Sequence, residues 1–333
     1  MILAGDVGGT KTILALFDLK AGKPVKVAEE KFSSKDYAGL EAIINAFRAK
    51  HKERVTGSCF GVAGPVVKGT VKTPNLPWLI ETSTLAKDVG TDRIWLLNDL
   101  EATAYGVLTL GDRDLYALNG GVPSNHDNFG LIAAGTGLGE STIYWDGKHY
   151  QALASEGGHG DFAPRSRLEI ELLSYLIERF GHVSYERVVS GPGLLNIYDF
   201  LKDRGYGEEP SWLRARLAAE DPSAAISQTA LAKEAEICIQ ALDIFVAVYG
   251  AEAGNLALRA KALGGVFIAG GIAPKIAAKL KDGSFMEAFV DKGRYRDLLR
   301  SIPVRLVLNE ETGLLGAAAY AARASAIGGS EST

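Results

Sequence analysis

Two glycine-rich segments have the composition of backbone turns that bind phosphate. The first comprises Gly5, Asp6, Val7, Gly8, Gly9 and Thr10, and the second runs from Gly135 through Thr136, Gly137, Leu138 and Gly139 to Glu140. Glycine lets the backbone approach a ligand closely and turn its N–H groups toward an anion. Neither segment has the spacing of a P-loop or of a Rossmann fingerprint before a helix. We therefore expect two separate turns, one in each half of the chain, that clamp the phosphates of a nucleotide.

Asp6 lies inside the first of these segments. A carboxylate beside a phosphate-binding turn suits a phosphate-bound magnesium ion, because Mg²⁺ keeps several waters and takes few protein carboxylates. The alternative is a glycine hairpin in which Asp6 only satisfies the amides of the turn. The second glycine segment favours the nucleotide interpretation, since it repeats the layout of the first.

Polar side chains at the ends of predicted elements form a second group of candidates. Asn98 and Asp99 follow a short predicted strand, and Glu156, His159 and Glu186 lie in two polar turns further along the chain. Phosphoryl transfer to a hydroxyl needs a carboxylate that accepts its proton. Carboxylates and an imidazole also accept and donate hydrogen bonds in fixed directions, so they can orient a polar ligand. Taken alone, however, the Asn98–Asp99 pair is better explained as a helix N-cap.

The surrounding pattern predicts alternating strands and helices. Residues 2–18 indicate a strand, a glycine turn and a second strand, and residues 131–145 repeat this hairpin. The other predicted elements are strands at 20–32, 58–63, 94–97 and 266–269 and helices at 37–49, 229–263 and 312–323. Gly270 and Gly271 follow the last strand, where a plain strand-to-helix turn is an open alternative to a ligand contact.

Composition limits the classes of function. The 333 residues are 47% hydrophobic with mean hydropathy +0.06, which is typical of a globular chain of two domains or two lobes. A net charge of −4 gives no basic excess for nucleic acid or anionic lipid. Cys59 and Cys238 are too few for a disulfide framework or a zinc knuckle, so we expect buried, reduced thiols. With no leader and no membrane-length apolar run, we expect a cytoplasmic protein without membrane partners.

Eight motifs, taken in order, carry a resemblance to a known family. They are GDVGGT, GVAGPV, LPW, LLNDLEATAYG, GTGLGE, SEGGH, HVSYERVVSGPGL and GGVFIAGGIAPK. Together they resemble bacterial ATP-dependent glucokinases of the hexokinase-like superfamily, which also holds actin and heat-shock chaperones. The similarity extends from Ile2 to about Tyr320. It implies a two-lobed α/β fold of the actin-like ATPase (ribonuclease H-like) type with a central cleft. The small lobe would comprise residues 1–109 plus about 309–333, and the large lobe residues 110–308.

The resemblance also implies roles for the candidate residues. The activity would be phosphorylation of D-glucose to glucose 6-phosphate, the first step of glucose use in glycolysis, with ATP and Mg²⁺ and in a homodimer. Asp99 would be the base that acts on the 6-hydroxyl, and Asn98, Asp99, Glu156, His159 and Glu186 would bind the sugar. Gly5, Asp6, Val7, Gly8, Gly9, Thr10, Thr136, Gly137, Gly270 and Gly271 would bind the nucleotide, with Asp6 also serving the metal.

The chain departs from the family pattern after GDVGGT. The family usually has Asn there, whereas this chain has Lys11 and Thr12, the residues common in the related ROK sugar kinases and repressors. ROK proteins typically carry a cysteine-rich zinc site after their ExGH turn. No cysteine lies between Cys59 and Cys238, so this zinc site cannot form here. We expect Lys11 to point to solvent rather than to add a charge near the phosphates.

Two rival functions belong to other classes. A glycosidase would use Asp99 and Glu156 as its acid and nucleophile, but the glycine turns would then be unexplained. A sugar-sensing regulator would need a DNA-binding helix-turn-helix, normally ahead of the first hairpin, whereas we expect the first strand to begin at Ile2. We therefore favour the kinase.

Overall fold

The computed structural model describes residues 1–20, 22–74 and 76–327 and divides the chain into two compact units. Unit 1 comprises Met1–Arg113 together with the chain from Asn309 onward, and unit 2 comprises Asp114–Leu308. The segment predicted to complete the small lobe extends to residue 333, and its last six positions, 328–333, lie outside the described residues.

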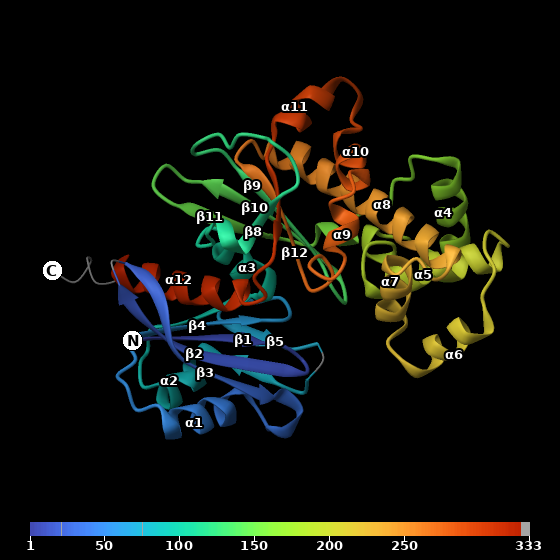
Figure 1. Ribbon diagram of the computed structural model, residues 1–333. Helices are drawn as coiled ribbons and strands as arrows, with labels where there is room; N and C mark the ends of the chain where they lie inside the picture. The colour runs from blue at the N-terminus through green and yellow to red at the C-terminus, as the bar shows by residue number, and fades with distance from the viewer. Residues whose placement is uncertain (21, 75, 328–333) are drawn as a thin grey trace. The chain divides into compact units, whose positions relative to one another are not determined.

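Unit 1 contains a five-stranded sheet in the order β3-β2-β1-β4-β7 (Figure 1). Its strands are β1 (Ile2–Val7), β2 (Lys11–Lys20), β3 (Lys23–Ser33), β4 (Gly57–Val62) and β7 (Ile94–Asn98). β2 pairs antiparallel with both β1 and β3, whereas β4 and β7 run parallel to β1. Every residue of β4 is buried, as expected for a central parallel strand covered on both faces. The predicted N-terminal hairpin and its third strand are confirmed.

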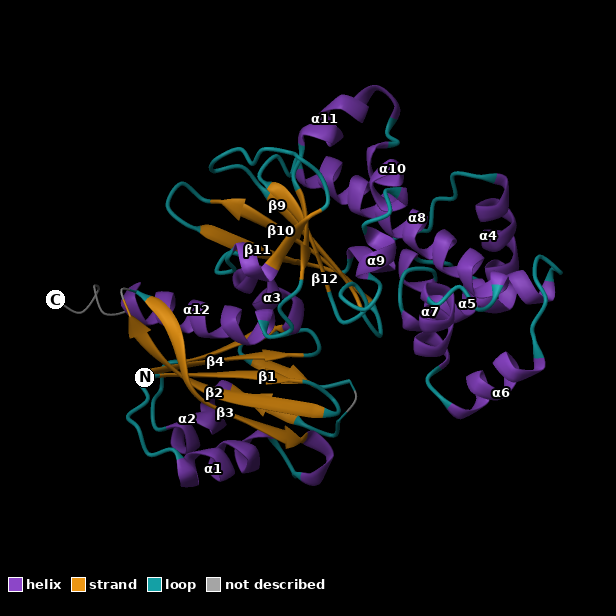
Figure 2. Ribbon diagram, in the orientation of Figure 1, coloured by secondary structure: helices purple, strands orange, loops and turns teal. Residues whose placement is uncertain are grey.

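Helices cover both faces of this sheet (Figure 2). On one face lie α1 (Leu40–Lys50) and α2 (Thr82–Val89), and on the other lie α3 (Asp99–Val107) and α12 (Thr312–Ile327). α1 buries Leu40, Ile43, Ile44 and Phe47, the helical spacing seen in the sequence. A two-stranded sheet of β5 (Thr70–Lys72) and β6 (Leu79–Glu81) and the 3₁₀ turns η1 (Ser34–Asp36) and η2 (Asp112–Asp114) complete the local structure.

Unit 2 repeats this sheet. Its strands are β8 (Leu115–Ala117), β9 (Phe129–Ala134), β10 (Leu138–Trp145), β11 (Tyr150–Ser155), β12 (Gly265–Ala269) and β13 (Val304–Val307), in the order β11-β10-β9-β12-β13-β8. β10 pairs antiparallel with both β9 and β11, β12 and β13 run parallel to β9, and the edge strand β8 is antiparallel to β13. Apart from the added edge strand β8, order and direction match unit 1, so the predicted duplication is confirmed at the level of topology.

The helices of unit 2 pack around one long apolar helix. They are α4 (Arg167–Phe180), α5 (Gly191–Asp203), α6 (Ser211–Ala219), α7 (Pro222–Leu231), α8 (Glu236–Ala260), α9 (Ala277–Leu280), α10 (Ser284–Val290) and α11 (Arg296–Ser301), with 3₁₀ turns η3 (Gly157–His159), η4 (Tyr185–Arg187) and η5 (Gly293–Tyr295). By length and composition alone, α8 could cross a membrane. However, 78% of its apolar window is buried inside unit 2, which is typical of a core helix.

The prediction of one continuous helix over residues 229–263 was wrong. α7 ends at Leu231 and α8 begins at Glu236. Between them Lys233 has φ 58°, in the left-handed region, and Ala235 is extended. A left-handed residue ends a helix because it cannot continue the hydrogen-bond pattern. The apolar spacing continues across this break because both helices bury residues in the same core.

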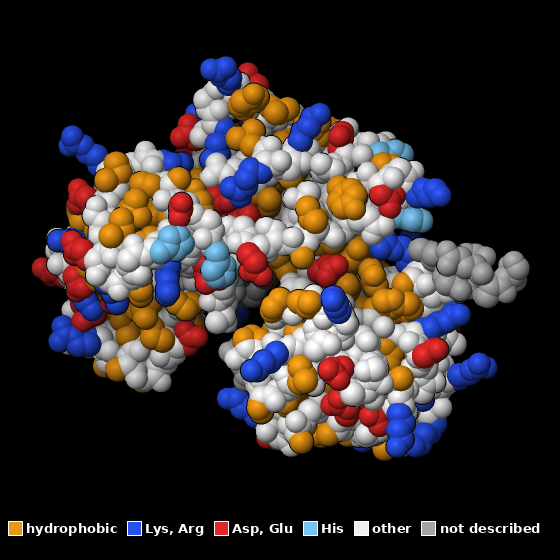
Figure 3. All heavy atoms as spheres, turned by 180° about the vertical axis from the view of Figure 1, so that it is seen from behind, with side chains coloured by type: hydrophobic (Ala, Val, Ile, Leu, Met, Phe, Trp, Pro, Cys, Tyr) orange, Lys and Arg blue, Asp and Glu red, His pale blue; other side chains and the backbone are white. Residues whose placement is uncertain are grey.

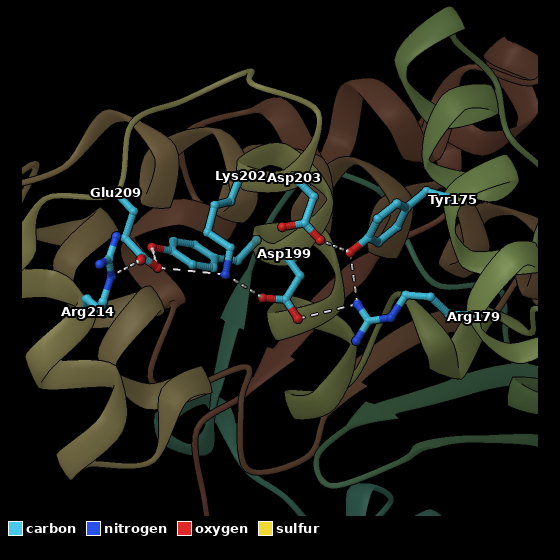
Figure 4. A network of polar contacts seen from close by, with 8 residues as sticks. Tyr175, Arg179, Asp199, Lys202, Asp203, Glu209 and Arg214 are labelled. Carbon is cyan, nitrogen blue, oxygen red and sulfur yellow. Dashed lines mark hydrogen bonds and ion pairs between the residues drawn. The ribbon is translucent and has the colours of Figure 1, made fainter.

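Polar contacts join α4, α5 and α6 on the outside of unit 2 (Figure 4). Arg179 of α4 forms an ion pair with Asp199 of α5 at 3.3 Å, and Lys202 of α5 lies 3.9 Å from Glu209, which precedes α6. Exposed pairs of this kind contribute little each. Their effect is to fix how the outer helices lie against α5.

On the face shown in Figure 3, acidic and basic side chains are interspersed over the surface.

The crossing of α3 and α12 depends on two glycines. A Cβ atom at Gly316 would lie 1.8 Å from the carbonyl oxygen of Ala102, and one at Gly106 would lie 1.9 Å from that of Thr312. We predict that Gly316→Ala destabilises the protein by about 1–3 kcal/mol, because the helices must separate. The matched control is Gly313→Ala, whose Cβ would lie 3.4 Å from Thr103 Oγ1. Urea unfolding measures both, and equal stability of the two variants would contradict the crossing.

Candidate active site

The first glycine segment is shorter as a turn than predicted. Gly5, Asp6 and Val7 belong to strand β1, so the prediction of a turn over these three residues was wrong. A Cβ atom at Gly5 would lie 2.5 Å from the Phe60 ring, so close packing against Phe60 explains the glycine at this position. The turn itself comprises Gly8, Gly9 and Thr10. Its N–H groups at Gly9 and Thr10 have no acceptor among the residues that the structure describes, so the turn presents two donors to an anion.

The turn is fixed by its own backbone and by Ser34. The Gly8 N–H donates to the Lys11 carbonyl oxygen at 3.0 Å. The Ser34 hydroxyl donates to the Gly8 carbonyl oxygen at 2.8 Å and lies 2.9 Å from the Thr12 hydroxyl. These bonds hold the turn in one conformation without using the two donors at its tip.

Asp6 and Asp99 act on each other at the carboxyl edge of the unit 1 sheet. The pKa of Asp6 is raised to about 6, first by burial and then by the charge of Asp99, while the charge of Lys11 opposes both. β1, β4 and β7 are parallel, so the residues that end them lie at one edge, where open α/β sheets bind ligands. A Cβ atom at Gly61 would lie 2.9 Å from the Ala102 Cβ, so the missing side chain lets α3 approach the sheet. Lys11 is exposed, as predicted, yet near enough to influence Asp6.

Asn98 is the N-cap of α3, which confirms that interpretation of the Asn–Asp pair. Its Oδ1 accepts from the Leu100 N–H at 2.9 Å, and its Nδ2 donates to the Gly64 carbonyl oxygen at 3.0 Å. Asp99 is the first residue of the helix and is exposed, with its Oδ1 accepting from the same Leu100 N–H at 2.8 Å. The cap therefore fixes the direction of the Asp99 carboxylate.

The second glycine segment follows β9 in unit 2 in the same way. β10 begins at Leu138, so Gly139 and Glu140 lie in a strand and the predicted turn through Glu140 was too long. The turn comprises Gly135, Thr136 and Gly137, and the Gly135 N–H donates to the Gly137 carbonyl oxygen at 2.8 Å. In the described part of the chain, the N–H groups of Thr136 and Gly137 have no acceptor. Both turns therefore present two consecutive free donors.

Glu156, His159 and Glu186 come together in unit 2. His159 Nδ1 lies 3.8 Å from Glu156 Oε2, and His159 Nε2 lies 3.7 Å from Glu186 Oε1. The other oxygen of Glu186 accepts from the Leu138 N–H at 3.0 Å, which joins this group to the second glycine turn. The side chains of Glu156 and His159 are 82% and 61% exposed, so their polar atoms are accessible to a ligand.

A cavity of about 760 Å³ in unit 2 lies beside the second glycine turn. That volume is within the range of small-molecule sites. Thr136 and Gly271 line it, as do Asp221, Ser223 and Lys275, which sequence reasoning missed. The predicted nucleotide residue Gly270 does not line the cavity. It has φ +87°, and a Cβ atom there would lie 2.3 Å from the Ala134 carbonyl oxygen, so it shapes the turn instead.

A signal for the missed residues exists in the sequence. Asp221 and Pro222 form an N-cap and first-turn proline pattern, and Asp221 Oδ1 accepts from the N–H groups of Ser223 and Ala224 at 2.9 and 3.1 Å. The Ser223 hydroxyl donates to the Gly191 carbonyl oxygen at 2.6 Å, and the Gly191 N–H donates to the Gly135 carbonyl oxygen at 2.8 Å. The start of α7 is thereby tied to the glycine turn.

The carboxylates of unit 1 fit a nucleotide-bound magnesium ion. Among the described residues, no group of three or more His, Cys, Asp or Glu side chains could hold a metal by itself. Mg²⁺ on a nucleotide needs only one or two carboxylates, because phosphates and water supply the remaining ligands. Asp6 meets that requirement, because Asp99 is nearby and the turn after β1 presents the two backbone donors at Gly9 and Thr10.

We predict that Asp6 lowers the stability of the fold. Its pKa rises on folding from 3.8 to about 6, so the folded state binds the proton more tightly and stability falls as pH rises between these values. Asp6→Asn removes this cost, and its free energy of unfolding should exceed that of the native chain by up to about 3 kcal/mol at pH 7. The gain should vanish toward pH 4. Urea unfolding over this range measures the difference, with the exposed Asp92→Asn of the same unit as control; no gain at pH 7 would contradict the prediction.

Comparisons with known proteins agree with this arrangement. The sequence profile described as Glucokinase matches residues 3–324. A glucokinase from Nostoc punctiforme is 42% identical over 338 residues, covering 97% of this chain and 99% of the relative. The solved structure of a glucokinase from an Antarctic psychrotroph has a TM-score of 0.86 and 30% identity, covering 97% and 98% of the two chains.

A more distant structure shows how widely the fold is shared. A ROK family glucokinase from Streptomyces griseus, solved with glucose and AMPPNP, has a TM-score of 0.64 at 20% identity over 97% of this chain and 99% of that one. The predicted actin-like ATPase fold is thereby confirmed. The match of the family profile over nearly the whole chain, together with relatives of 42% identity, shows that this protein belongs to the glucokinase family.

Proposed function

We propose that this chain transfers the γ-phosphoryl group of ATP to the 6-hydroxyl of D-glucose with Asp99 as the general base. The observation that carries the proposal is the exposed Asp99 carboxylate, fixed by the α3 cap, beside Asp6 at the sheet edge that bears the first glycine turn. A carboxylate in this setting accepts the hydroxyl proton as the oxygen attacks phosphorus. Membership of the glucokinase family supports phosphate transfer to glucose.

Each unit offers backbone donors that would bind the phosphates of the nucleotide. The free N–H groups at Gly9 and Thr10 and at Thr136 and Gly137 suit phosphate oxygens, since aligned backbone N–H groups bind anions. The cavity lined by Gly271, Ser223 and Lys275 suits the adenosine end. Asp6 would hold the magnesium ion, mainly through water. When bound, this ion neutralises charge that develops on the phosphates.

The sugar would be bound by Glu156, His159, Glu186 and Asn98. Two carboxylates on either side of an imidazole offer acceptors and a donor in fixed directions, which suits adjacent hydroxyls. Asn98 retains one amide hydrogen beyond its bond to Gly64. A site that pairs every hydroxyl rejects analogues that lack one, because a buried polar group would lose its partner.

The cellular setting follows from the same proposal. We expect a cytoplasmic homodimer that performs the first step of glucose use in glycolysis. Both cysteines, Cys59 and Cys238, are free and buried, as in a reducing compartment. Sedimentation at micromolar protein concentration tests the homodimer.

We predict that Asp99→Asn lowers kcat by about 10²–10⁴-fold, because the amide cannot accept the proton. The glucose Kd from calorimetry should change less than threefold, since the amide oxygen retains the bond from the Leu100 N–H. The control is Asp92→Asn, an exposed aspartate of the same unit, which should keep native turnover. Near-native turnover of Asp99→Asn would exclude Asp99 as the base.

The donor and the acceptor are tested by an ADP-release assay over a panel of sugars and phosphate donors. We predict the highest kcat/KM for glucose with ATP. Mannose, fructose and glucosamine test the hydroxyl contacts, and ADP and polyphosphate test the donor site. Absence of activity with every pair would exclude the kinase assignment, and a preference for another sugar would exclude glucose as the main substrate.

A further inference from the structure

Two buried carboxyl groups lie beneath the proposed sugar site and have no part in the mechanism above. Glu140, on β10, is 2% exposed, and Glu252, on α8, is fully buried. Both contact one guanidinium: Arg259 Nη2 lies 3.0 Å from Glu140 Oε2 and also donates to Glu252 Oε1. Two buried acids therefore share one cation, Arg259, whose side chain is 53% exposed. We call these three residues the carboxyl cluster.

The charge of the carboxyl cluster is balanced only when one acid keeps its proton. Oε1 of Glu140 is buried and has no hydrogen-bond partner among the described residues. Burial, followed by the charge of Glu252, raises the pKa of Glu140 to about 8, although Arg259 opposes the rise. At neutral pH Glu140 is therefore protonated, Glu252 and Arg259 form the ion pair, and the cluster is neutral.

Other titratable groups also face this cluster. Tyr249 of α8 lies near Glu140, and burial raises its pKa well above the neutral range. Tyr185 of η4 and Lys292, between α10 and η5, both face Glu252; burial raises the pKa of Tyr185 and lowers that of Lys292. Neither the two tyrosines nor Lys292 adds a negative charge to the cluster near neutral pH. Glu140 is thus the group whose proton sets the charge of the cluster near pH 8.

One side of the cluster supports the turn that carries His159. A Cβ atom at Gly157 would lie 2.4 Å from Glu140 Oε2, so η3 lies directly on this carboxyl group. A Cβ atom at Gly158 would lie 2.0 Å from the Leu138 carbonyl oxygen, on the same strand as Glu140. A change in the Glu140 side chain therefore acts on the backbone that places Glu156 and His159.

The other side of the cluster supports the turn that carries Glu186. Glu252 Oε2 accepts from Asn255 Nδ2 at 2.8 Å, and the same amide donates to the Tyr185 hydroxyl at 3.0 Å. Tyr185 is 4% exposed and directly precedes Glu186 in η4. The two turns that carry the proposed sugar-binding residues, η3 and η4, therefore both contact one hydrogen-bonded network of buried side chains.

We propose that Glu140 is a positioning residue for sugar binding, whose carboxyl group, held by Arg259 against Glu252, sets the placement of η3 beneath Glu156 and His159. This inference rests on the proposed function, because it assigns the sugar to these residues. Loss of the proton adds a buried negative charge that pushes the two acids apart. The turn above Glu140 moves with it, and glucose affinity falls as pH rises through about 8.

The test compares three variants of the full chain by steady-state kinetics between pH 6.5 and 9.5. For the native chain we expect the glucose KM to rise about tenfold between pH 7 and pH 9. Glu140→Gln, which imitates the protonated acid, should keep a KM within twofold of native at pH 7 and stay flat to pH 9.5. Glu140→Ala should raise the glucose KM at least tenfold at every pH, with kcat and the ATP KM changed less than threefold.

The matched control is Glu169→Ala. Glu169 is also a buried glutamate of unit 2, 6% exposed and 3.2 Å from Arg165, but it belongs to α4 and caps neither sugar turn. It should lose stability and keep the native glucose KM. A native KM for Glu140→Ala, or an alkaline rise in Glu140→Gln equal to that of the native chain, would overturn the proposal.

A measurement without substrate separates this proposal from the proposed function. Amide hydrogen exchange of the sugar-free protein should increase over residues 155–160 and 183–189 in Glu140→Ala and remain native in Glu169→Ala. If the exchange changes as expected but the native protein does not phosphorylate glucose, the positioning role of Glu140 is retained and glucose is rejected as the substrate. Unchanged exchange over both segments would reject the positioning role whatever the activity.

Discussion

The geometry of unit 1 depends on one position where a side chain is missing. Gly61, near the carboxyl end of β4, lets the first turns of α3 lie against this strand, because any larger residue would meet Ala102. The approach puts Asp99 close enough to Asp6 for each charge to act on the other. In unit 2 a strand glycine likewise lets a helix approach the sheet, but that helix carries different side chains. There Gly130 of β9 makes room for Leu256 of α8, and this helix carries the buried Glu252 with its partner Arg259 instead of an exposed acid.

The two sheets share their order and directions, yet their equivalent turns differ in charge. In unit 1 the second-to-last residue of the first strand is Asp6, and in unit 2 the equivalent residue of β9 is Ala133. Unit 1 therefore offers carboxylates beside its backbone donors, whereas unit 2 offers an uncharged turn that opens onto a cavity. A duplicated scaffold thus places acidic side chains beside one turn and a cavity beside the other, without duplicating their chemistry. The specialisation comes from a few side chains at strand ends, where loops carry function on a rigid frame.

Local patterns predicted much of this fold. The two hairpins, the α1 face and the cap at Asn98 follow from spacing and turn residues, which act over a few positions. The errors arose where distant contacts decide. Gly5 reads as part of a turn, but packing against Phe60 places it in a strand. Residues 229–263 read as one helix, because both α7 and α8 point apolar residues into one core. Lys275 and Ser223 lie on separate elements and meet at the cavity only after folding, and the burial of Glu140 beneath η3 leaves no periodic signal.

The return of α12 to unit 1 has a consequence for folding. Its buried residues Leu314, Ala317, Ala318 and Ala321 complete, together with α3, the cover of the sheet over β1 and β4. All strands of that sheet precede unit 2 in the chain, whereas α12 follows it. Docking of α12 therefore closes a loop that contains the whole of unit 2. Contacts between segments so far apart in sequence form slowly, because the entropy of loop closure is lost before the contact stabilises the fold.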